Sequence, residues 1–124
     1  MARLRRTTSV IVALLVTGVT LSSCGTGSAV SQARRACRDV NAALTIYSRS
    51  QRAGLSAADR AQLEASAMST LLKATPAAAA ATSLDGSWNP LMTTINEAER
   101  VPLKNLIPSL TRLCQVANSS TPYL

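Results

Sequence analysis

The sequence predicts an all-α fold, a small bundle of about four to five helices clamped by a disulfide. Alanine is the commonest residue and aromatic residues make up only 2% of the 124-residue chain, a composition that favours helices packed through small side chains. Beyond residue 31, apolar residues recur at steps of three and four, and no alternating strand pattern occurs. Two cysteines, Cys37 and Cys114, bracket this helical region.

The N-terminal part of the chain has the composition of an export signal. Three arginines, Arg3, Arg5 and Arg6, precede an uncharged, mostly apolar stretch of about 12 residues, 10–21. As a helix this stretch would span about 18 Å, well short of the roughly 30 Å hydrocarbon core of a membrane. A cleaved signal is therefore favoured over a permanent membrane span.

The apolar stretch ends in Leu21-Ser22-Ser23-Cys24, with Gly25 directly after the cysteine. This arrangement resembles the lipobox of bacterial lipoproteins. The resemblance implies that residues 1–23 are a signal peptide, that Cys24 receives the lipid (palmitate) and becomes the first mature residue, and that the exported protein is held on the outer face of the plasma membrane. The alternative is cleavage nearby by an ordinary signal peptidase, which would leave Cys24 as a free thiol.

The rest of the chain divides into a linker, a domain and a tail. Residues 24–31 comprise Cys24 and a Gly/Ser-rich segment typical of a flexible tether. The helical domain is expected over 32–118, and residues 119–124 are expected to be a frayed tail.

Capping residues and prolines divide the domain into helices. The first is expected over about 31–53 with Gly54 as its C-cap, and the second follows Ser56 as N-cap, with Asp59 completing a capping box. Thr75-Pro76 and Asn89-Pro90 each combine an N-cap residue with proline at the first helical position. These pairs predict helices from about 76 to 84 and 89 to 100. A last helix is expected over 103–118, starting or bending near Pro108.

The remaining cysteines, Cys37 and Cys114, form an even pair in a chain that is expected to be exported, which predicts a disulfide. Two buried thiols and a redox pair are the alternatives, although a redox role usually requires a CxxC spacing that is absent here. The mature part, in which Cys37 and Cys114 bracket an alanine-rich helical region, is similar to small uncharacterised lipoproteins of actinobacteria, a resemblance that implies no particular activity.

The charge of the mature part is too mild for a nucleic-acid-binding protein. The chain has 13 basic and 6 acidic residues, and removal of the three leader arginines leaves a net charge of about +4. No aromatic residues alternate with the basic ones. On the first helix, four arginines share a face that could contact a membrane or another surface; a merely solvated face is the alternative. They are Arg34, Arg38, Arg49 and Arg52.

The residue inventory argues against an enzyme. The chain has no histidine, which excludes imidazole ligands and Ser-His or Cys-His nucleophiles. We therefore expect no catalytic residue, no metal site and no cofactor. Tyr47 and Trp88 are candidates for the edge of a groove, with a place in the core as the alternative.

These observations lead to two functional hypotheses. The first is a membrane-anchored extracytoplasmic lipoprotein whose helical domain is a non-enzymatic interaction module for an envelope protein or the cell wall. The alternative is a carrier of a small apolar ligand or lipid, with a cavity between the helices. That cavity would be lined by Leu44, Tyr47, Leu71, Trp88 and Leu110.

Overall fold

A computed structural model of the protein describes residues 28–123. This part of the chain forms five α-helices and one 3-10 turn, with no strand, which confirms the predicted all-α class. In chain order the elements are α1 (Ser28–Ser50), α2 (Ala57–Leu72), α3 (Thr75–Leu84), η1 (Gly86–Trp88), α4 (Asn89–Glu97) and α5 (Leu103–Asn118).

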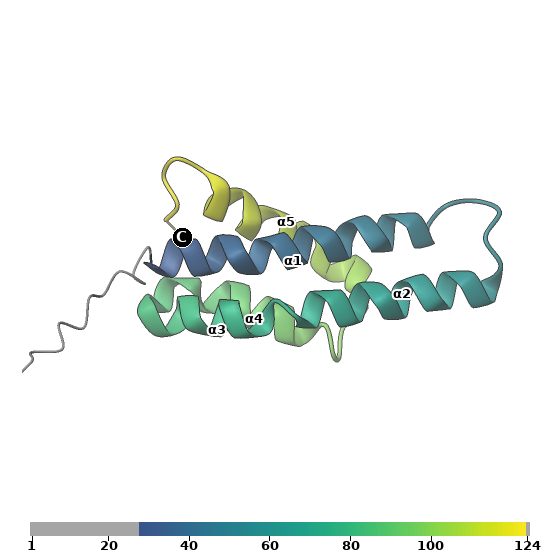
Figure 1. Ribbon diagram of the computed structural model, residues 1–124, viewed down its shortest axis with the longest axis horizontal. Coiled ribbons are helices and arrows are strands. Elements are labelled where there is room, and N and C mark those ends of the chain that lie inside the picture. Colours follow the sequence, from purple (N-terminus) through teal and green to yellow (C-terminus); the bar gives the residue numbers. More distant parts are fainter. Residues whose placement is uncertain (1–27, 124) are drawn as a thin grey trace, which may run out of the picture.

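The longest helix, α1, is the element on which the others pack. It has 23 residues and is therefore about 34 Å long. α2 and α3 follow one another back along α1, and α5 packs on α1 as well (Figure 1). α4 lies against α3 and α5. The start of α1, the end of α3 and the end of α5 thus lie at one end of the bundle, and the α1–α2 turn lies at the other.

The core between these helices is built largely from alanine. Small side chains allow helix axes to approach closely, and α1 and α3 contact one another through fully buried alanines. Ser50 is the one polar residue among the buried residues that the structure describes; its Oγ donates to the Tyr47 carbonyl at 2.6 Å. The buried alanines include Ala33, Ala36, Ala43, Ala78 and Ala81, and the largest buried side chains are Trp88, Leu71, Leu91, Ile95 and Leu110.

The cap predicted for α2 is confirmed. Ser56 Oγ accepts a hydrogen bond from the backbone N–H of Asp59 at 3.0 Å, and the Ser56 hydroxyl lies 2.6 Å from Asp59 Oδ2. Before this cap, α1 ends at Ser50 rather than at 53. Gly54 has a φ of +86°, the left-handed conformation that glycine adopts most easily, so it serves the turn between the helices.

The N-caps predicted at Thr75 and Asn89 are wrong, although helices begin at these positions. Each is the first helical residue, and proline occupies the next position. The preceding residues, Ala74 and Trp88, already have helical backbone angles, so neither junction has the extended residue that a capping side chain requires. The Ala78 N–H donates to the Ala74 carbonyl at 3.0 Å across the α2–α3 junction.

The predicted break before the last helix is confirmed, and α5 starts at Leu103 rather than at Pro108. α4 ends at Glu97, three residues early, and the chain breaks at Pro102 before α5 begins at Leu103. Pro108 lies inside α5, and the helix continues through it to Asn118. Because Pro108 has no N–H and its ring crowds the carbonyl of the preceding turn, the helix loses one hydrogen bond there and also incurs a steric cost, together about 3 kcal/mol.

The tether is shorter than predicted, because α1 begins at Ser28 and residues 28–31 are helical. Ala29 is buried four residues before buried Ala33, so core packing extends the helix by a further turn. The predicted signal peptide, Cys24 and residues 25–27 lie outside the described residues. None of the helices within 28–123 is both long enough and apolar enough to span a membrane.

Candidate functional site

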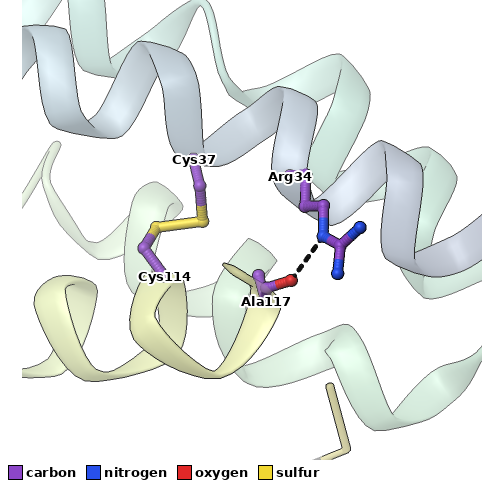
Figure 2. Close-up of a disulfide and its surroundings, with 4 residues drawn as sticks. All are labelled: Arg34, Cys37, Cys114 and Ala117. Atoms are coloured by element: carbon purple, nitrogen blue, oxygen red, sulfur yellow. Dashed lines mark hydrogen bonds between the residues drawn. A yellow bond between two sulfur atoms is a disulfide. The ribbon is translucent and has the colours of Figure 1, made fainter. Parts of the chain in front are cut away.

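The predicted disulfide is confirmed. Figure 2 shows the sulfur atoms of Cys37 and Cys114 bonded between α1 and α5, with the two Cα atoms 5.4 Å apart. Both residues are buried. The bond closes a loop between positions 77 residues apart, and the chain-entropy model gives it a stabilisation of about 4–5 kcal/mol. The crosslink therefore joins the first and last helices of the domain.

Arg34 reinforces the same junction one turn before Cys37. Its Nε donates to the Ala117 carbonyl at 2.7 Å (Figure 2), and its Nη2 donates to the Ser119 carbonyl at 3.2 Å. The last carbonyls of a helix have no partners within the helix, and a cation at that end also interacts favourably with the helix dipole. Arg34, predicted as a surface or membrane contact, thus has a structural role at the end of α5.

The other three predicted arginines do not form one continuous face with Arg34. Arg38 is exposed one turn further along α1. Arg49 is exposed in the last turn, about 16 Å from Arg38 along the helix axis. Arg52 lies beyond the end of α1, so its predicted place on the helix face is wrong. Arg34 and Arg38 therefore lie in the first half of α1, whereas Arg49 and Arg52 lie at and beyond its C-terminal end.

Tyr47 and Trp88 occupy different environments. Trp88 is only 1% exposed and belongs to the core, which was the alternative interpretation. Tyr47 is half-buried and borders a surface hollow of about 400 Å³ together with residues of α2 and the start of α5. That hollow is not lined by Trp88, so the two aromatic residues do not form its edge together.

The side chains that the carrier hypothesis placed around a cavity belong to the packed core. Leu71, Trp88 and Leu110 are fully buried in the core, and Leu44 and Tyr47 are partly buried and pack against the core. A ligand at this position would have to displace side chains that contact one another.

A cleft of about 460 Å³ between α4 and α5 was missed by the sequence analysis. Arg112 provides a cation on its wall, and Leu113 and Val116 provide apolar surface. The sequence does show that Arg112 and Val116, four residues apart, share one face of the last helix. It does not show that α4 packs beside this face and forms the other wall of the cleft. The other lining residues are Pro90, Thr94, Ser109 and Tyr123.

The acidic groups of the domain are dispersed. Asp85 Oδ1 accepts the backbone N–H of Ser87 at 2.9 Å, and this bond, followed by the Ser87 side chain, lowers the pKa of Asp85 below its ordinary value. Glu97 and Arg100 form an exposed ion pair at 2.9 Å. Within residues 28–123, no three His, Cys, Asp or Glu side chains gather in a group that could hold a metal ion.

Comparisons with protein-family models, curated proteins and solved structures found no match for this chain. The fold and its crosslink define the class of the protein as a small disulfide-clamped helical domain.

Proposed function

We propose that this chain is the precursor of an exported lipoprotein, anchored through lipid on Cys24 to the outer face of the plasma membrane. Its helical domain is a non-enzymatic interaction module for an envelope protein or a cell-wall component. The observation that most supports this proposal is the shortness of the segment between Cys24 and the first helix. Helix α1 begins at Ser28, only four residues after Cys24. Four residues reach at most about 14 Å, so a lipidated Cys24 would hold the domain at the membrane surface.

The disulfide supports the exported location. Crosslinks of this kind persist in oxidising compartments outside the cytosol and are rare where thiols are kept reduced. Cys37 and Cys114 are bonded to each other, which leaves Cys24 free for lipidation.

The cleft between α4 and α5 supports an interaction role. Its guanidinium group, from Arg112, suits a carboxylate or phosphate, and the Leu113 and Val116 side chains suit an adjoining apolar group. Binding of an acidic, partly apolar segment of an envelope partner uses both features. The exposure of Arg112 makes the contact accessible to a partner that approaches along the membrane.

The anchor is tested by expressing the full chain and its Cys24→Ala variant in a lipoprotein-processing bacterium. We expect the parent protein to carry the mass of a lipid on an N-terminal Cys24 and to partition into the membrane fraction. The variant should lack that mass and lose membrane retention. A parent protein found in the medium with Cys24 unmodified would overturn the proposal.

The interaction surface is tested in intact cells with a photo-crosslinking residue at Ser109, in the cleft, or at exposed Ser66 on α2 as the control. We expect one partner to be captured from Ser109 only, and the Arg112→Glu variant to abolish its capture. Equal capture from Ser66, or capture unaffected by Arg112→Glu, would contradict a role for the cleft.

A further inference from the structure

The largest exposed apolar side chains of the described region lie at the end of the bundle where α1 begins. These are Leu84, which is 52% exposed, and Tyr123, which is 81% exposed. We propose that this end docks on the lipid bilayer, with Leu84 and Tyr123 inserted between the lipid headgroups. We name it the anchor-side end and define it as residues 28–30, 84–85 and 119–123. The inference rests on the proposed anchoring through Cys24.

Contacts between distant parts of the chain form this end. Leu84, the last residue of α3, and Asp85, its C-cap, border a common hollow with residues 28–30 of α1. Arg34 holds the Ser119 carbonyl beside the first turns of α1. Tyr123 lines the α4–α5 cleft together with Pro90, at the start of α4. Figure 1 shows the same grouping, with the chain after α5 returning to the start of α1.

A lipid anchor on Cys24 would hold the anchor-side end closer to the bilayer than any other part of the domain. Ser28 is four residues from Cys24 and therefore at most about 14 Å from it. The α1–α2 turn, around Gly54, is about 34 Å further away along α1. The bilayer is therefore the surface nearest to Leu84 and Tyr123, and it can bury their side chains.

The chemistry of these side chains suits the region between lipid headgroups and acyl chains. Tyrosine is enriched there because its ring is apolar and its hydroxyl remains hydrated. Leucine contributes apolar surface that gains from leaving water. Asp85 is a negative charge at the same end, and the guanidinium of Arg34 is held by the Ala117 and Ser119 carbonyls. The docking is thus driven by apolar contact.

The docking is tested with the full lipidated protein in vesicles of phosphatidylethanolamine and phosphatidylglycerol. A small fraction of the lipid carries a photoreactive diazirine near the glycerol end of one acyl chain. After illumination, labelled peptides are mapped by mass spectrometry. Because a docked side chain lies beside the acyl chains, we expect peptides with Leu84 and Tyr123 to be labelled about tenfold more than the α1–α2 turn.

A matched pair of variants separates docking from incidental labelling. Leu84→Ser combined with Tyr123→Ser changes two exposed side chains and should reduce labelling of the anchor-side end about tenfold. Leu55→Ser changes a leucine at the far turn and should leave that labelling unchanged.

The possible failures are distinguishable. A protein that carries lipid on Cys24 but is labelled evenly over both ends, or is labelled equally in the double variant, overturns the docking and leaves the anchor intact. A protein without lipid on Cys24 overturns the anchor and the docking together. Crosslinks from Leu84 and residues 28–30, which do not line the α4–α5 cleft, to a protein in cell membranes, with no lipid label, identify a protein interface at this end and overturn the docking.

Discussion

Arg34 on the first helix donates from Nε to the carbonyl oxygen of Ala117 on the last helix at 2.7 Å. Arg34 lies three residues before Cys37, and Ala117 lies three residues after Cys114. On a helix, residues three apart share a face, so the hydrogen bond and the disulfide join the same two faces one turn apart (Figure 2). The charged hydrogen bond also orients the end of α5 that the disulfide alone would leave free to pivot.

Removal of the disulfide should weaken the domain severely. We expect Cys37→Ala with Cys114→Ala to lower the free energy of unfolding by about 2–5 kcal/mol, because the unfolded chain regains the freedom that the crosslink removes. Urea unfolding followed by the fluorescence of Trp88 measures the loss. The parent protein unfolded with a reductant present is the control, and its midpoint should match that of the variant. A loss below about 1 kcal/mol would contradict the clamp.

Loss of the Arg34 guanidinium should destabilise α5 at its C-terminal end. We expect Arg34→Met to lower the free energy of unfolding by about 1–2 kcal/mol, because two carbonyl groups lose a charged donor. Arg38→Met, at an exposed arginine one turn away, is the matched control and should change stability by less than about 0.5 kcal/mol. Equal effects of the two changes would show that Arg34 contributes only its charge.

A larger side chain on the buried face of α3 should be poorly tolerated. Ala78 of α3 is fully buried, and α3 packs on α1 and α4, so Ala78→Leu is expected to cost about 1–3 kcal/mol because neighbouring helices must move apart. Ala61→Leu, on the exposed side of α2, is the control and should be nearly neutral. Thermal unfolding of both variants distinguishes these outcomes, and an unchanged melting temperature for Ala78→Leu would disprove close helix packing at this position.

Asp85 should titrate at a lower pH than an ordinary aspartate, because the Ser87 backbone N–H and then the Ser87 side chain lower its pKa. A lowered pKa in the folded state means that the contribution of Asp85 to stability is present above the ordinary aspartate pKa. It is lost as the pH falls through the folded-state value. Carboxyl-carbon NMR across the acidic range measures this titration directly.

The Ser87→Ala variant separates the two causes of the Asp85 shift. Since the backbone N–H is the larger cause and remains, the pKa of Asp85 should rise but stay below its ordinary value. An Asp85 that already titrates normally in the parent protein would exclude the hydrogen bond to Ser87.

Local sequence patterns predicted most of the helical elements. The three-four spacing of apolar residues, the Ser56 cap and the Pro102 break depend on neighbours within one or two turns, and each is present in the structure. The pairing of Cys37 with Cys114 followed from their even number once Cys24 was assigned to lipid. The lipobox itself remains a prediction from residues 21–24, which lie outside the described part of the chain.

The tertiary structure decided what depends on residues far apart in the chain. The role of Arg34 requires a carbonyl 83 positions away, and the first turn of α1 forms because Ala29 finds a core to pack against. Leu84 and Tyr123 are ordinary exposed residues in the sequence, and only the folding of α3 and α5 back to the start of α1 brings them to one end. Helical periodicity determines which residues share a face, whereas packing of the helices determines which faces meet.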